Sequence, residues 1–153
     1  MKPFSVQSIH AIADAVSGGS ANDNRAPVGH YRSGPKLERF FGALNIQLRI
    51  GSGSRLPTVI DVLINVNQKE PEAIVRVVEA VSDPRDFLDE PEKQAAVVEY
   101  LIKRLKFDGY ELRATATYGS CLHWELARLQ RNPSELPSLA STMLVSRLTC
   151  NGR

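Results

Sequence analysis

The sequence predicts a mostly α-helical fold, a compact domain of five to seven helices with a minor two-stranded β element. Three observations support this fold class. Apolar residues recur at three- and four-residue steps in several separate stretches, which is the spacing of one helix face. Prolines and glycines stand where such helices would begin and end. Two short stretches instead alternate apolar and polar residues, as strands do.

The N-terminal part, residues 1–34, predicts one helix followed by a flexible loop. The helix is expected over Val6–Ser17, with Ser5 as its N-cap and Gly18 at its end. Its apolar face comprises Ile9, Ile12, Ala13 and Val16. His10 and Asp14 interrupt the apolar run that a cleaved signal peptide would need, so we expect this helix to stay on the protein. Residues 18–34 are rich in Gly, Ser, Asn and Pro and predict the loop.

Residues 35–117 are predicted to form the helical core domain. Helices are expected from Pro35 to Leu44, from Ser54 to Asn67 and from Pro71 to Val81. The residues expected to face inward are Leu37, Phe40, Phe41 and Leu44 in the first, Leu56, Val59, Ile60, Leu63 and Ile64 in the second, and Ile74, Val77, Val78 and Val81 in the third. A turn through Phe87 should follow the third helix.

The stretch from Pro91 to Leu112 is the one around which the chain is expected to be organised. Its apolar face is predicted to hold Ala95, Val98, Leu101, Ile102 and Leu105. Pro91 is suited to the first turn of this helix, and the basic residues from Lys103 to Lys106 are suited to its last turn. Gly109 can adopt the left-handed backbone conformation that ends a helix.

Two short strands are expected to pair with each other. Asn45–Ile50 alternates three aliphatic residues with polar ones, and Tyr110–Ala116 does the same with smaller residues. Because an isolated strand leaves its backbone groups unpaired, the sequence predicts that these two stretches pair. Residues 118–153 predict a C-terminal helical extension or linker, with one helix over Cys121–Leu129 and another near Leu139–Leu148.

Composition indicates an ordinary globular protein. The chain has 153 residues, 42% of them hydrophobic and 24% charged, which suits a single domain with its own core. The sequence contains no apolar run of about 20 residues that would cross a bilayer. Two cysteines, Cys121 and Cys150, are too few for a disulfide framework and favour reduced thiols. We therefore expect a cytoplasmic protein that needs no cofactor, and the sequence does not specify its oligomeric state.

Charge is segregated along the chain. Residues 21–56 contain six basic and two acidic side chains, a net charge of +4, whereas residues 69–92 contain three basic and eight acidic ones, a net charge of −5. Two interpretations follow: a basic face for nucleic acid together with an acidic face for another partner, or two halves that pair with each other within the fold.

Several motifs with catalytic or binding potential also have structural explanations. Arg25 and His30 have the R-x4-H spacing of HEPN ribonucleases, but Pro27 and Gly29 interrupt the helix on which that family carries the motif. Cys121 and His123 supply two zinc ligands, which is insufficient for a site. The loop of residues 51–54 precedes a helix and would hold an anion with backbone N–H groups, or serve as a plain capped turn.

A longer series of features resembles the N-terminal domain of abortive-infection proteins of the AbiJ type, found in bacterial anti-phage systems. The series consists of a basic helix with Phe40-Phe41, the stretch Gly-Ser-Gly-Ser-Arg-Leu ending at Leu56, the turn Asp83-Pro-Arg-Asp-Phe87, and the helix end Leu101 to Leu112. It covers about half the chain. The resemblance implies a sensing or recognition domain rather than an enzyme. Members commonly carry a separate C-terminal nuclease domain, for which about forty remaining residues are too few.

The resemblance implies two groups of candidate contact residues. They are Ser54 and Arg55 in the loop, and Asp108, Gly109 and Tyr110 at the helix end. Arg39 and Arg49, with Arg55, would contact phosphates if the ligand is nucleic acid. The leading hypothesis is a non-enzymatic recognition module for phage defence that binds nucleic acid or an effector protein, such as a separately encoded nuclease, and is not membrane-bound.

Two hypotheses of other classes remain. In the first, a winged-helix-like DNA-binding regulator, the helix from Ser54 would read DNA and Tyr110–Ala116 would be the wing, although the helix offers only Asp61, Asn65 and Asn67 as polar base-reading side chains. In the second, a small nuclease would use His30 or His123.

Overall fold

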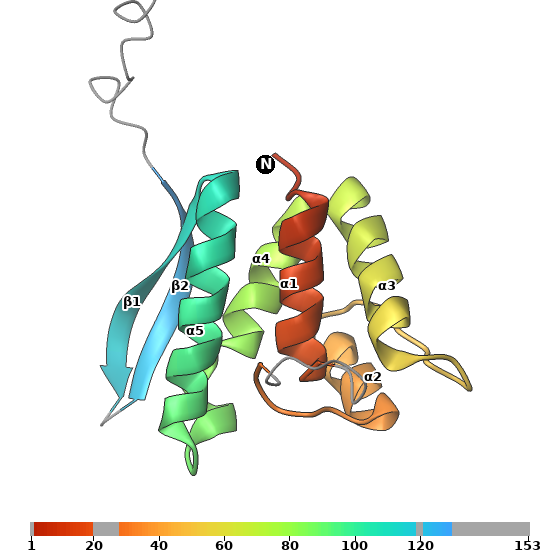
Figure 1. Ribbon diagram of the computed structural model, residues 1–153, viewed down its shortest axis with the longest axis horizontal. Helices are drawn as coiled ribbons and strands as arrows, with labels where there is room; N and C mark the ends of the chain where they lie inside the picture. The colour runs from red at the N-terminus through yellow and green to blue at the C-terminus, as the bar shows by residue number, and fades with distance from the viewer. Residues whose placement is uncertain (1, 20–27, 119–120, 130–153) are drawn as a thin grey trace, which may run out of the picture.

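The computed structural model describes residues 2–19, 28–118 and 121–129, and within them it confirms the mostly helical fold with a two-stranded antiparallel sheet (Figure 1). The helices are α1 (Val6–Ser17), α2 (Gly34–Ala43), α3 (Arg55–Lys69), α4 (Pro71–Val81) and α5 (Pro91–Leu105), with short 3-10 turns η1 (Pro84–Phe87) and η2 (Lys106–Asp108). The strands are β1 (Tyr110–Tyr118) and β2 (Cys121–Arg128). Among these described residues, no helix is long and apolar enough to cross a membrane.

Local signals set the helix ends. The Ser5 side chain accepts a hydrogen bond from the Ser8 N–H, and Gly18 takes the left-handed conformation at φ 74°, so α1 has the predicted bounds. Pro71 and Pro91 occupy the first turns of α4 and α5, where a missing N–H costs nothing.

The most completely buried of the described helices is α1, whereas the sequence predicts that the chain is organised around residues 91–112. Figure 1 shows α1 between α5 and α3, and it packs on α3, α4 and α5. Eight of its twelve residues are buried, including the four of its predicted apolar face. Ala11 and Ala15 add small buried side chains around that face, so α1 is apolar on most of its circumference, which is typical of a buried helix.

The predicted inner face of α5 was wrong at one position and omitted another. Val98, Leu101 and Leu105 are buried as expected, but Ala95 is exposed and Val97 takes its place in the core. Because alanine offers little apolar surface, the helix gains more by turning the valine inward. The inward-facing residues predicted for α4 are all buried.

The predicted strand pairing was also wrong. β1 forms where expected, but its partner is β2, with Leu112 opposite Leu126 and Ala114 opposite Trp124. Residues 121–129 had been expected to form a helix, yet Leu122, Trp124 and Leu126 also fit a period of two. Trp124 and Leu126 pack on the core, so the hairpin crosses the predicted boundary at residue 117.

Candidate recognition groove between α2 and residues 45–50

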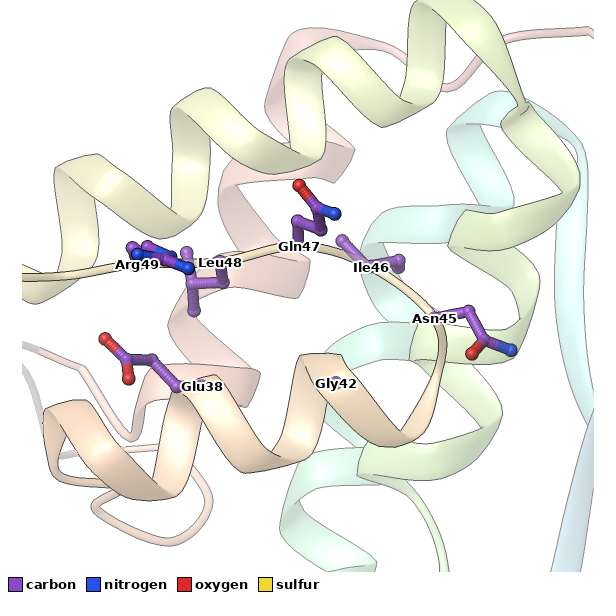
Figure 2. Close-up of a pocket in the computed structure, with 7 residues that line it drawn as sticks. All are labelled: Glu38, Gly42, Asn45, Ile46, Gln47, Leu48 and Arg49. Carbon is purple, nitrogen blue, oxygen red and sulfur yellow. The ribbon is translucent and has the colours of Figure 1, made fainter.

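Residues 45–50 form an extended segment between α2 and α3 that pairs with no strand among the described residues (Figure 2). Ile46, Leu48 and Ile50 are buried, as their alternation predicts, while Asn45, Gln47 and Arg49 are exposed. The alternation of apolar and polar residues shows only that one side of the chain is buried. A strand also needs a neighbouring strand to pair with its backbone, and residues 45–50 have none among the described residues. Positive φ angles at Asn45 (59°) and Gly51 (52°) turn the chain at both ends of the segment.

Two hydrogen bonds attach the ends of this segment to α2. The Ile46 N–H donates to the Phe41 carbonyl oxygen at 2.9 Å, and the Ile50 N–H donates to Glu38 Oε1 at 2.9 Å. The middle of the segment has no such attachment, and there a groove of about 650 Å³ opens between it and α2. Its lining residues are Glu38, Gly42, Asn45, Ile46, Gln47, Leu48 and Arg49 (Figure 2). We call this the α2 groove.

Several backbone groups of the segment have no hydrogen-bond partner among the described residues. They are the N–H groups of Gln47, Leu48 and Arg49 and the carbonyl oxygens from Ile46 to Arg49. Along an extended chain, successive residues direct these groups to opposite edges. The N–H groups of residues 46 and 50 point to α2. By this alternation, the N–H and the carbonyl oxygen of residue 48 also point to α2, into the α2 groove.

A second, smaller cavity of about 250 Å³ lies on the other flank of the segment, against α3 and α4. Val62, Val66 and Ala73 give it an apolar wall, and Lys69 and the Arg76–Glu70 ion pair line its polar part. A cavity therefore lies on each side of the segment.

The charge of this part of the surface is positive. Between residues 34 and 69 the chain has five basic and two acidic side chains, a net charge of +3. Arg49 is exposed and has no ion pair with any residue in the described ranges. Glu38 is the one carboxylate among the lining residues, and one of its oxygens already accepts the Ile50 N–H.

Of the three predicted phosphate-contacting arginines, Arg39 and Arg49 are exposed and Arg55 is turned inward. Arg55 Nη1 donates to the Arg32 carbonyl at 2.6 Å and to the Ser17 carbonyl at 3.2 Å, and its guanidinium lies over the Tyr31 ring, 4.0 Å from the ring centre. These contacts join the end of α1 to the start of α3. The three arginines thus do not present one cationic surface.

The loop before α3 holds Ser54 at the N-cap position, but its side chain makes no capping hydrogen bond. Ser54 is exposed, and its carbonyl accepts from the Thr58 hydroxyl at 2.8 Å. Since the neighbouring Arg55 guanidinium is bound to carbonyl oxygens elsewhere, it does not complete the anion site that the loop suggested.

The second predicted group, Asp108 to Tyr110, anchors the N-terminal residues. One Asp108 carboxylate oxygen accepts from the Ser5 N–H at 2.8 Å and from the Ser5 hydroxyl at 2.9 Å. Tyr110 is buried, stacks on Phe4 and donates from its hydroxyl to a backbone carbonyl near the N-terminus. Burial raises the pKa of the Tyr110 phenol. Gly109 supplies the left-handed turn between them at φ 83°.

The two histidines considered for catalysis are not brought together with each other, since each lies near a different carboxylate. His30 stacks on Phe87, and its Nδ1 lies 3.5 Å from a Glu90 carboxylate oxygen. His123 is exposed on β2. Arg25, the other half of the R-x4-H spacing, lies outside the described residues, and within those residues no three His, Cys, Asp or Glu side chains cluster as metal ligands would.

The elements assigned to a winged helix lie on opposite sides of the molecule. Figure 1 shows α3 at one side and the β1–β2 hairpin at the other, with α1 and α5 between them. A recognition helix and a wing must reach the same stretch of DNA, and this arrangement does not favour that.

The α2 groove was missed by reasoning from the sequence. Gly42, Gln47 and Leu48 were not among the candidate residues, although a signal was present. Asn45 and Gly51, residue types that tolerate positive φ, flank an alternating stretch too short to reach a neighbouring strand by itself.

Comparison of the chain with known protein families, curated proteins and solved structures gave no match.

Proposed function

We propose that this protein is a non-enzymatic recognition module of a bacterial abortive-infection system, and that it binds a protein partner through the α2 groove. The observation that carries the proposal is the groove itself, a hollow of about 650 Å³ lined by unpaired backbone groups and an exposed arginine. This volume falls within the range of about 300 to 1,000 Å³ typical of ligand sites.

The choice of a protein partner over nucleic acid rests on the arginines. Binding of a nucleic-acid backbone needs several cations on one surface. Because Arg55 is engaged by carbonyl oxygens, only Arg39 and Arg49 of the predicted set are exposed. Backbone N–H and carbonyl groups lining a groove are suited instead to another polypeptide. The defence role follows from the resemblance between residues 37 and 112 and the AbiJ-type domain.

The test of this function is phage plating on bacteria that express the chain together with its genomic neighbours. We expect fewer plaques than on cells without it. We expect Arg49→Glu to restore plaque numbers because it replaces the basic residue that lines the groove with an acidic one. The matched control is Arg128→Glu, the same charge change on the exposed face of β2, which should leave protection intact. Protection that survives Arg49→Glu, or no protection by the wild-type chain, would contradict the proposal.

A further inference from the structure

We infer that the partner enters the α2 groove as an extended, acidic peptide segment that pairs with the backbone of Leu48 as an added strand. This inference rests on the proposed function and specifies the ligand of the same groove. The segment of residues 46–49 is extended and has the unpaired edge of a strand, without the sheet that normally accompanies one.

Three free backbone groups are directed to the groove. They are the N–H and carbonyl of Leu48 and the carbonyl of Ile46. Their direction follows because the Ile46 and Ile50 N–H groups bond to α2 and every second residue of an extended chain directs its backbone groups to the same edge. In an antiparallel pair, one peptide residue opposite Leu48 would exchange both hydrogen bonds with it. The attachments at positions 46 and 50 limit the added strand to a few residues.

Gly42 provides the clearance for that strand. A Cβ placed on Gly42 would meet no atom within 4 Å, so the wall of α2 is open at this point. Neighbouring strands lie about 4.8 Å apart, and a peptide needs this free width beside Leu48. Figure 2 shows Gly42 across the groove from Ile46 and Gln47, so α2 carries no side chain along this part of the groove.

Charge favours an acidic peptide. The exposed charged side chains of residues 34–69 are four basic and two acidic, a net charge of +2, because Arg55 is turned inward. Arg49 has no carboxylate partner among the described side chains. Side chains of a strand alternate between its faces. An acidic residue next to the one that pairs with Leu48 would therefore lie beside Arg49.

The direct test is fluorescence polarisation with a labelled, capped tripeptide of sequence Glu-Val-Glu, short enough to lie between the attachments at residues 46 and 50. Wild-type protein should bind it more tightly than the valine–lysine analogue and more tightly than a labelled single-stranded oligonucleotide. Gly42→Leu adds a side chain at a residue that lines the groove, and the added Cβ meets no existing atom within 4 Å, so this variant should abolish binding. Glu38→Gln keeps an oxygen for the Ile50 N–H but removes the groove's carboxylate, so it should tighten binding of the glutamate peptide.

Backbone pairing has its own readout. Methylation of the peptide's central N–H should weaken binding about fivefold, the effect of losing one hydrogen bond. Amide hydrogen exchange at Leu48 should slow when the peptide is added, whereas exchange at Gln47 and Arg49, directed to the other edge, should not change. Equal affinity of the methylated peptide, an unprotected Leu48, or tighter binding of the oligonucleotide would each overturn the inference.

The two proposals fail in different ways. If Gly42→Leu abolishes phage protection but neither peptide binds the wild-type protein, the groove recognises something other than an acidic strand, and only the inference is wrong. If the peptide binds as described but protection is insensitive to Gly42→Leu, the inference stands and the proposed function is wrong.

Discussion

At the scale of residues, single side chains fix the segments between helices by hydrogen bonds to their backbone. Arg55 is the clearest case, because its guanidinium reaches two backbone carbonyls in different parts of the chain and stacks on Tyr31. The same residue had been predicted to contact a ligand. An arginine that donates to the Arg32 carbonyl, and to a Ser17 carbonyl that also accepts from the Arg32 N–H, stabilises the fold. A buried acceptor without a donor costs about 1 to 3 kcal/mol.

We therefore expect Arg55→Ala to destabilise the protein by about 2 kcal/mol, because it removes charged hydrogen bonds to the carbonyls of Ser17 and Arg32. Urea denaturation followed by circular dichroism measures this change. Arg39→Ala is the control: Arg39 is exposed on α2, and its removal should change the free energy of unfolding by less than about 0.5 kcal/mol. Equal small effects of both variants would show that Arg55 is not structural.

At the scale of elements, the effect of a glycine near a helix end depends on its backbone conformation and on the space around it. Gly109 and Gly42 both lie near helix ends and both have open space around an added Cβ. They differ in backbone conformation. Gly109 has φ 83°, which L residues adopt at a cost, while Gly42 lies in the last turn of α2 without a positive φ.

These two glycines should respond oppositely to alanine. Gly109→Ala should lower the free energy of unfolding by about 1 kcal/mol through backbone strain. Gly42→Ala should raise it by about 0.5 kcal/mol, because alanine restricts the unfolded chain and favours a helix. Thermal and urea denaturation of both variants provide the comparison. A stabilising Gly109→Ala would mean that the turn after η2 does not need the left-handed conformation.

Over the whole molecule, the N-terminal residues connect the ends of two helices. Asn67 at the end of α3 exchanges two hydrogen bonds with the Phe4 backbone, and Asp108 after α5 binds Ser5. These contacts join residues separated by 63 and 103 positions in the sequence. They position α1 between α3 and α5, and so they determine the core.

Asp108→Ala should consequently reduce the free energy of unfolding by about 1 to 2 kcal/mol, because it leaves the Ser5 N–H without its acceptor. A double-mutant cycle with Ser5→Ala should give a coupling energy of about 1 kcal/mol in denaturation experiments. The alternative, that Asp108 contacts a ligand as the resemblance implies, predicts an unchanged stability and lost partner binding instead.

The sequence by itself determined helices α1 to α5, although it also predicted a helix where β2 forms. Their periodicity and their capping residues are local properties, so the ends of α1, the inner face of α4 and the mostly helical class follow from them. It also located the buried side of residues 46–50, since alternation in an extended chain depends only on which positions are apolar.

Only the tertiary structure decided what each stretch pairs with. β1 joins β2 rather than residues 45–50, because the hairpin partner lies next in the chain and needs no long loop closure. Residues 45–50 therefore keep a free edge beside α2. Which arginines face solvent was also undetermined by sequence, because the carbonyl oxygens that bind Arg55 come from segments 23 and 38 positions away. Such distant partners leave no periodic signal around the residue itself.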